Sequence, residues 1–205
     1  MRINLKGLNF LVEPNNHQKF WSNFSMWEQK DLNFVIENAE EDKIFIDVGA
    51  WIGPYTLLAA QMGMKVYAFE PDNIAYRELK NNIQLNDFKH NPEIYNFGLS
   101  NKETTAYLYS NTDDFGNSES SLINYKNEKK TKKIQIEIKN FLHEFDKIKN
   151  NHLNFKIKFL KIDIEGGEFL FEKDIYNLVN LNKLYCILSY HHMIFNKNKF
   201  KKNFF

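Results

Sequence analysis

The 205-residue chain has little cysteine and no long apolar run, and each shortage excludes a class of protein. Its single cysteine, Cys186, rules out a disulfide framework and, within the apolar run 185–188, is expected to act as a small buried hydrophobe. No run approaches the roughly 20 apolar residues of a membrane-spanning helix, and the N-terminal segment is too interrupted for a signal peptide. We therefore expect a soluble, cytoplasmic protein without a membrane span.

The chain also lacks a large excess of positive or of negative residues. The 27 Lys and Arg residues are offset by 26 Asp and Glu residues, so the formal net charge is only +1. Proteins that bind nucleic acid through its phosphates usually carry a basic surplus or patch. Nucleic acid is therefore not an expected partner, and the length suits one domain with a well-buried core.

Apolar runs alternate with segments of helical periodicity. The runs IFIDV, VYAF and FLKIDI are apolar nearly throughout, as in strands that helices cover on both faces. The expected strands are 44–48, 65–69, 93–99, 159–164 and 185–190, and the expected helices are about 56–62, 74–85 and 168–179. This order predicts an α/β fold with a Rossmann-like, doubly wound, mostly parallel sheet.

The chain divides into three expected regions. Residues 1–43 form an N-terminal helical cap, because apolar residues between Phe20 and Ala39 recur at roughly helical spacing. Residues 44–192 form the main domain, in which alternating strands flank a polar loop at 110–133. Those strands are expected at 105–109 and 134–138, and residues 193–205 form a short tail rich in Lys, Asn and Phe.

The segment IFIDVGAWIGPYT carries a glycine turn between a buried strand and a helix. Gly49 allows a tight turn, Gly53 lets the backbone approach a ligand, and Pro54 suits the first helical turn. An anionic group is expected at this helix N-terminus. The alternative is an ordinary strand-to-helix turn in which the glycines serve geometry alone.

Glu70 makes a cofactor site the better interpretation. It ends the next strand about 20 residues beyond Gly49, where dinucleotide-type folds place a carboxylate that accepts both ribose hydroxyls. The turn lacks the complete G-x-G-x-x-G of a pyrophosphate cradle, so a cofactor without phosphates fits better than NAD(P) in an oxidoreductase. S-adenosylmethionine offers an adenosine to Glu70, and its ammonium needs an acceptor such as Asp47 or a backbone carbonyl.

The segment KIDIEGGE gathers acidic residues at the end of a predicted central strand. Asp163 ends the strand, Glu165 follows, and Glu168 enters the next helix, so the three acids are expected to converge on the ligand-binding edge. Methyl transfer to a hydroxyl is assisted by a group that accepts its proton, for which Asp163 is the first candidate and Glu165 the second. The alternative is that these acids orient the loop or cap the helix.

Two histidines and the question of a metal complete the list of candidates. His191 and His192 follow the last predicted strand, and either could act as a base near neutral pH, although a surface histidine is the commoner case. Paired acids also suit a divalent cation, but the sequence offers only one tight acidic cluster. No metal site is therefore predicted.

Four blocks of the sequence resemble the FkbM-type methyltransferases, a branch of the class I S-adenosylmethionine-dependent enzymes. The blocks are residues 46–60, 66–86, 97–103 with 120–122, and 159–168. The resemblance implies S-adenosylmethionine as cofactor and methyl transfer to a hydroxyl oxygen of a carbohydrate or small-molecule metabolite. The cofactor contacts that it implies are Asp47, Gly49, Ala50, Gly53, Thr56, Glu70 and Pro71, with weaker contacts from Gly98 and Leu99.

The resemblance also raises a question about the C-terminus. In that fold a helix and two strands normally follow the strand that ends near Tyr190, and the roughly 15 residues that remain are too few to form them. The C-terminal strands are therefore expected to be missing. The uncovered edge of the sheet would then favour a homo-oligomer. A catalytically impaired binding or scaffold protein that keeps this fold is the alternative from another class.

Overall fold

The computed structural model describes residues 1–110, 115–116, 118, 120–122, 132–152, 154–165 and 167–189. His191, His192 and the predicted tail at 193–205 lie outside the described residues, as does most of the predicted polar loop. Two sheets and an N-terminal hairpin account for all the described strands.

The main sheet is parallel and has the order β11-β10-β3-β4-β5. Its strands are β3 (Ile44–Val48), β4 (Lys65–Phe69), β5 (Glu93–Tyr95), β10 (Ile157–Ile162) and β11 (Tyr185–Leu188). The chain runs outward from β3 to β5 and then returns to the other side of β3. The order therefore reverses between β3 and β10, and such switch points form the ligand crevice of α/β sheets.

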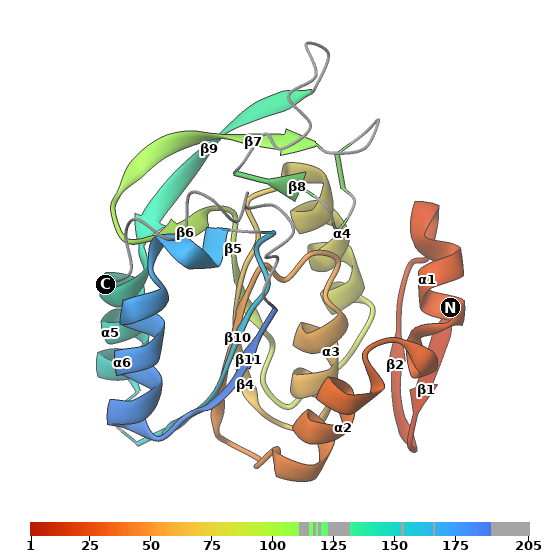
Figure 1. Ribbon diagram of the computed structural model, residues 1–205. Helices are drawn as coiled ribbons and strands as arrows, with labels where there is room; N and C mark the ends of the chain where they lie inside the picture. Colours follow the sequence, from red (N-terminus) through yellow and green to blue (C-terminus); the bar gives the residue numbers. More distant parts are fainter. Residues whose placement is uncertain are drawn as a thin grey trace.

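Helices cover both faces of this sheet, which confirms the predicted doubly wound, Rossmann-like α/β fold (Figure 1). One face carries α3 (Pro54–Gln61) and α4 (Asn73–Gln84), and the other carries α5 (Phe141–Asn151) and α6 (Glu172–Asn182). The strands are apolar throughout because alternate residues enter two different cores: Phe45 packs on the α3 side, whereas Ile44 and Ile46 pack on the α5 side. Asp72 caps α4 by accepting from the Ile74 N–H at 2.8 Å.

A second, four-stranded sheet lies across the carboxyl ends of the parallel strands (Figure 1). It has the order β6-β9-β7-β8, and its strands are β6 (Gly98–Ser100), β7 (Thr104–Ser110), β8 (Ser120–Ser121) and β9 (Lys133–Asn140). The predicted strands at 105–109 and 134–138 form its antiparallel pair β7–β9. The single strand predicted at 93–99 is wrong, because the chain breaks at Asn96 and Phe97 and passes from β5 in one sheet to β6 in the other.

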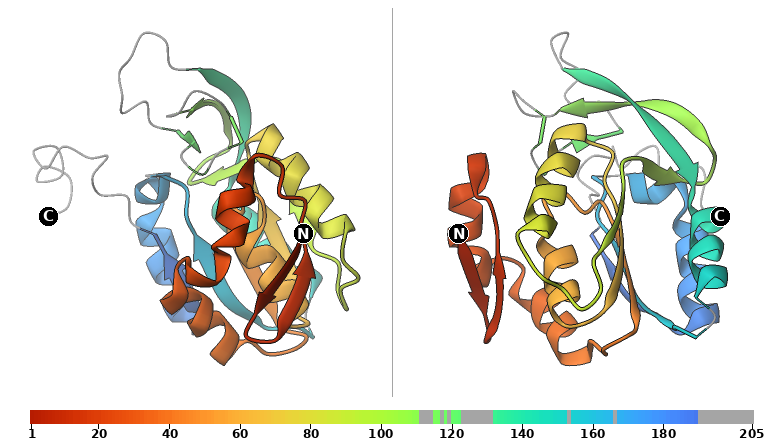
Figure 2. Two further views of the ribbon diagram at one scale, coloured as in Figure 1. Left: turned by 90° about the vertical axis from the view of Figure 1, so that its right-hand side faces the viewer. Right: turned by 180° about the vertical axis from the view of Figure 1, so that it is seen from behind.

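The N-terminal region is only partly helical. A hairpin of β1 (Arg2–Leu5) and β2 (Leu8–Leu11) precedes α1 (Gln18–Ser22) and α2 (Gln29–Asn38), with short 3₁₀ turns at Asn15–His17 and Phe24–Met26. The helical prediction is therefore wrong for residues 2–11. Lys6 and Gly7 both have positive φ, as a two-residue type I′ turn requires. The hairpin lies on the α3 and α4 side of the molecule (Figure 2), where the Leu11 N–H donates to Asn86.

Within the described residues, β11 is the outermost strand on its side of the main sheet. Cys186 lies on this strand, is partly buried, and packs against the α5 and α6 core, and burial raises the pKa of its thiol to about 11. No helix in the described part of the chain has the length and apolar character needed to cross a bilayer. Association through the β11 edge stays a prediction.

Candidate functional site

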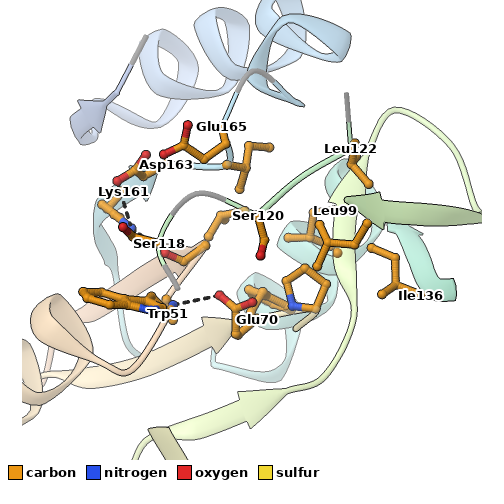
Figure 3. A pocket seen from close by; sticks show the side chains of 18 of the residues that line it. Trp51, Glu70, Leu99, Ser118, Ser120, Leu122, Ile136, Lys161, Asp163 and Glu165 are labelled. Carbon is orange, nitrogen blue, oxygen red and sulfur yellow. Dashed lines mark hydrogen bonds and ion pairs between the residues drawn. The ribbon is translucent and has the colours of Figure 1, made fainter. Parts of the chain in front are cut away.

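A cleft lies between the carboxyl ends of the parallel strands and the second sheet (Figure 3). About 840 Å³ of space in and around the cleft, part of it open to solvent, is free of protein atoms. Its floor comes from the turns after β3, β4 and β10, and its roof from apolar side chains of the second sheet. The roof residues are Leu108, Leu122, Ile136 and Ile138.

Gly49 makes the turn at the centre of the floor. Its φ of +80° is unfavourable for any residue with a side chain. A Cβ at this position would lie 1.9 Å from the backbone oxygen of Asp163. The ends of β3 and β10 therefore meet so closely that only glycine fits between them.

The backbone N–H groups of the turn donate hydrogen bonds to other groups of the protein. Those of Gly49 and Ala50 donate to the Phe69 carbonyl at 2.9 and 3.1 Å, and that of Gly53 donates to the Ala50 carbonyl at 2.9 Å. The Trp51 N–H donates to a carboxylate oxygen of Glu70 at 2.8 Å. These four donors are thus used inside the protein, so the anionic group expected at the N-terminus of α3 stays a prediction for the first helical turn alone.

Glu70 is the most deeply buried carboxylate on the cleft wall, with an exposed fraction of 7%. Its Oε2 accepts from the Trp51 N–H and its Oε1 accepts from the Asp72 N–H, both at 2.8 Å. A carboxylate has about four lone-pair sites, so each oxygen keeps acceptor capacity for a ligand hydroxyl. Burial raises the pKa of the Glu70 carboxyl to about 7, and the two backbone donors counteract this only in part.

Lys161 and Asp47 form a buried ion pair beneath the floor. They are neighbours in the β3–β10 register, their exposed fractions are 4% and 0%, and Nζ lies 3.3 Å from Asp47 Oδ1. The same ammonium donates to the Gly49 carbonyl at 2.6 Å. Burial by itself would lower the pKa of Lys161, but the carboxylates of Asp47 and Asp163 outweigh it and raise that pKa above its usual value.

The structure divides the nine residues predicted to contact the cofactor into two groups. Six line the cleft, namely Gly49, Ala50, Glu70, Pro71, Gly98 and Leu99. Asp47, Gly53 and Thr56 are not among the lining residues. Asp47 is bound by the Thr56 hydroxyl at 2.7 Å on one side and by Lys161 on the other. A Cβ on Gly53 would lie 2.7 Å from Leu79, so this glycine lets α4 pack closely against the turn.

The three predicted acids also divide into residues that line the cleft and one that does not. Asp163 and Glu165 line the cleft just after β10, and the Glu165 carbonyl accepts from the Ser121 hydroxyl at 2.6 Å. Glu168 is fully buried and is not among the lining residues, so the predicted convergence of all three acids is wrong. Within the described residues, no group of three or more His, Cys, Asp or Glu side chains could hold a metal ion.

Several cleft residues were not predicted from the sequence. Lys161 is one, and its only sequence signal is a lysine within the apolar stretch FLKI at residues 159–162. Trp27, Trp51 and Tyr55 are three more, and they form an aromatic side of the cleft. Trp27 comes from the N-terminal region and lies 5.6 Å from the Tyr55 ring, so this region contributes directly to the cleft wall.

A short stretch near Gly116 joins the roof to the floor. Its N–H donates to Asp72 Oδ2 at 2.7 Å, and its carbonyl accepts from the Trp51 indole at 2.8 Å. Gly116 has a φ of +89°, and a Cβ would lie 2.7 Å from Ile74. Ser118 and Ser120, which follow closely, also line the cleft (Figure 3).

Comparison with known proteins gives a family but no close relative. The curated proteins contain no match. The crystal structure of methyltransferase FkbM from Methylobacillus flagellatus KT aligns with 16% identity and a TM-score of 0.46 over 89% of this chain. This chain spans 46% of the length of that protein. The tRNA (uracil-54, C5)-methyltransferase of Pyrococcus abyssi, solved with S-adenosyl-L-homocysteine, aligns with 21% identity and a TM-score of 0.32, over 46% of this chain and 23% of its own.

These two structural likenesses are too weak to carry an argument. The model of the methyltransferase FkbM domain, however, matches residues 47–171, which is more than half of the chain and includes the floor and roof of the cleft. This chain belongs to the FkbM methyltransferase family.

Proposed function

We propose that the protein is an S-adenosylmethionine-dependent methyltransferase that methylates a hydroxyl of a carbohydrate or small-molecule metabolite. The observation that carries the proposal is Glu70, a buried carboxylate that lines the cleft at the carboxyl end of the strand next to the glycine turn. Bound there, S-adenosylmethionine would supply an electrophilic methyl group on a sulfonium.

The cleft suits a nucleoside better than a dinucleotide. Glu70 accepts the ribose hydroxyls, and Leu99 and the roof side chains provide an apolar surface for the adenine. Four backbone N–H groups of the turn are already used within the protein, which disfavours a pyrophosphate and hence a nicotinamide-dependent oxidoreductase. The first turn of α3, where Pro54 and Tyr55 line the cleft, faces the carboxylate of the donor.

The acceptor hydroxyl enters on the side of the acids that follow β10. Asp163 and Glu165 are the cleft carboxylates able to take its proton there, and His191 remains a candidate from outside the described residues. The roof excludes water from the reacting groups. Trp27 and Tyr55 give this side an aromatic surface suited to the apolar face of a sugar ring.

Replacing Glu70 by alanine tests the donor site. Hydrogen bonds to a charged acceptor are worth about 1.5–3 kcal/mol each, so the loss of the ribose contacts is expected to weaken S-adenosylmethionine binding about 100-fold. Isothermal titration calorimetry measures this affinity, and circular dichroism verifies that the variant is folded. Glu93→Ala removes a carboxylate from the first residue of the neighbouring strand β5, outside the cleft lining, and is the control, with unchanged affinity expected. A folded Glu70→Ala variant with wild-type affinity would contradict the proposal.

The affinity for the donor is also expected to depend on pH. Because the pKa of Glu70 is raised to about 7, the carboxyl is protonated in the free protein below that pH and loses acceptor capacity. Binding then requires loss of this proton, so the affinity is expected to fall by up to about tenfold per pH unit between pH 7 and 5. The donor ammonium stays charged in this range and adds no dependence.

The Glu70 carboxyl affects the stability of the free protein in the opposite direction: donor affinity rises with pH, whereas stability falls. Its folded pKa lies above its unfolded value, so protonation favours the free folded protein, and this contribution to the free energy of unfolding declines as pH rises between about 4.5 and 7. Titrations at several pH values measure the binding effect, and Glu70→Gln is expected to abolish it. If the affinity of the wild-type protein did not change between pH 5 and 7, Glu70 would not bind the ribose hydroxyls.

A further inference from the structure

The N-terminal region places a carboxylate, that of Glu28, at the rim of the cleft. Glu28 follows Trp27, which lines the cleft, and its Oε2 accepts from the hydroxyl of Tyr55, another lining residue, at 2.7 Å. Glu28 itself is exposed and is not among the lining residues. Its carboxylate therefore lies at the opening of the cleft, beside the aromatic side.

The side chain of Glu28 does not serve the helix that it precedes. Glu28 is the N-cap residue of α2, but its carboxylate accepts no hydrogen bond from the first turn of that helix. Its backbone has a φ of +38°, a left-handed conformation that is costly for a residue with a side chain. Strained residues of this kind cluster at functional sites, so the contact with Tyr55 points to a role in the cleft.

The negative charge of Glu28 lacks a cation partner. Within the part of the chain that the structure describes, the Tyr55 hydroxyl is the one donor to this carboxylate, and no basic side chain pairs with it. Burial raises the pKa of Glu28, Asp163 raises it further, and Tyr55 and Lys161 lower it only in part. The effect of Asp163 indicates that the two carboxylates share the same end of the cleft. Oε1 of Glu28 keeps its lone pairs for a hydroxyl of a ligand.

We infer that Trp27 and Glu28 bind the acceptor and select a neutral polyhydroxyl ring, an assignment that rests on the proposed function. The indole of Trp27 receives the apolar face of the ring, and the carboxylate of Glu28 accepts from one of its hydroxyls. The indole is held in place by three other rings, those of Phe20, Phe24 and Tyr55, at centroid distances of 5.2, 6.0 and 5.6 Å. An aromatic surface next to a carboxylate matches a sugar or cyclic polyol.

The charges at the opening disfavour ionic acceptors. A phosphorylated or acidic sugar would bring a second negative charge to the carboxylate of Glu28, which has no cation to balance it. A cationic acceptor would meet Lys161, whose Nζ lies 5.5 Å from the centre of the Tyr55 ring. A neutral ring meets neither repulsion.

Binding of sugars to the protein saturated with S-adenosylhomocysteine tests the assignment without turnover. Saturation-transfer difference NMR measures the affinities of a panel of neutral methyl glycosides, with glucose 6-phosphate as anionic probe and choline as cationic probe. In Glu28→Gln the amide oxygen still accepts from Tyr55, but an NH₂ group replaces Oε1. The variant is expected to weaken glycoside binding about 10- to 100-fold and to change S-adenosylhomocysteine binding by less than about twofold.

Glu37→Gln is the matched control, because it makes the same change at an exposed position of α2. It is expected to leave the affinities for the glycosides and for S-adenosylhomocysteine unchanged. Trp27→Leu keeps an apolar side chain without the ring and is expected to weaken the glycosides about two- to tenfold. Tyr55→Phe releases Glu28 and is expected to weaken them about three- to tenfold, with no further loss when it is added to Glu28→Gln.

Three results would overturn the assignment: glycoside affinities that Glu28→Gln leaves unchanged, an equal loss of S-adenosylhomocysteine affinity in that variant, or binding of glucose 6-phosphate or choline in preference to every glycoside. A protein that binds S-adenosylhomocysteine but none of the glycosides would likewise show that the acceptor is not a neutral sugar ring. A folded wild-type protein that does not bind S-adenosylhomocysteine would contradict the proposed function itself, whatever the sugars do.

Discussion

Gly49→Ala is expected to lower the free energy of unfolding by about 4 kcal/mol or more, the largest effect of any conservative substitution in the cleft. A left-handed φ costs an alanine about 1 kcal/mol. The remainder comes from the overlap of the new Cβ with the Asp163 backbone oxygen at 1.9 Å, which is relieved only if β3 or β10 moves. Urea denaturation followed by circular dichroism measures the loss.

The hairpin turn offers a matched control for this prediction. Gly7 has a φ of +87°, close to that of Gly49, but a Cβ there would meet nothing within 4 Å. Gly7→Ala is therefore expected to cost only about 1 kcal/mol. Comparable losses in the two variants would mean that φ alone sets the requirement for glycine and that the β3 and β10 turns are not in tight contact.

Lys161→Met is expected to lower the free energy of unfolding by about 3–5 kcal/mol, because it leaves the Asp47 carboxylate buried without its cation. Asp47 would keep the hydroxyl of Thr56 as a donor, which does not balance a full charge. Adding Asp47→Asn to the same chain removes that charge and is expected to restore most of the loss. Chemical denaturation of the single and double variants measures both changes.

Lys158→Met is the control for this prediction, because it changes the same residue type on the same strand. Lys158 pairs with Glu40, whose side chain is 52% exposed, and exposed pairs contribute about 0–1 kcal/mol. A loss below 1 kcal/mol is therefore expected. If Lys161→Met were no more destabilising than Lys158→Met, the buried pair would not hold the floor of the cleft.

The main sheet was predictable from the sequence because its strands are buried on both faces. β3 and β4 begin and end at the predicted residues, since each is a continuous apolar run closed by a glycine turn or by Glu70-Pro71. The hairpin at residues 2–11 was missed although Ile3, Leu5 and Phe10 alternate around Lys6-Gly7. Its signal is short, and Lys-Gly is a weaker type I′ turn than Asn-Gly.

The floor of the cleft was also largely predictable, because the carboxyl ends of parallel strands meet at one edge. Gly49, Glu70 and Asp163 lie there for this reason. The interpretation of Asp47 as a ligand contact depended on its side of the strand, which sequence periodicity does not give for a strand buried on both faces. Only the register of β3 with β10 places it next to Lys161.

The roof was beyond prediction from local pattern. β6 pairs with β9 in parallel, and these strands are separated by β7, β8 and a long polar segment. The sequence predicts the alternating strands themselves but not that they leave the main sheet. At the break, the Asn96 side chain donates to the Glu70 carbonyl at 2.9 Å and so fixes the turn of the chain against the end of β4.

The chain enters the second sheet through Asn96-Phe97 before β6 and leaves it through the step from β9 directly into α5. β6 and β9 are parallel, so the entry at Gly98 and the exit at Asn140 lie at opposite ends of a ladder of three residue pairs. The segment between these two points lies outside the main sheet, so a change in its length leaves the pairing of β3, β4 and β10 intact. Gly49, Glu70 and Asp163 follow strands of the main sheet, so their positions do not depend on the length of that segment.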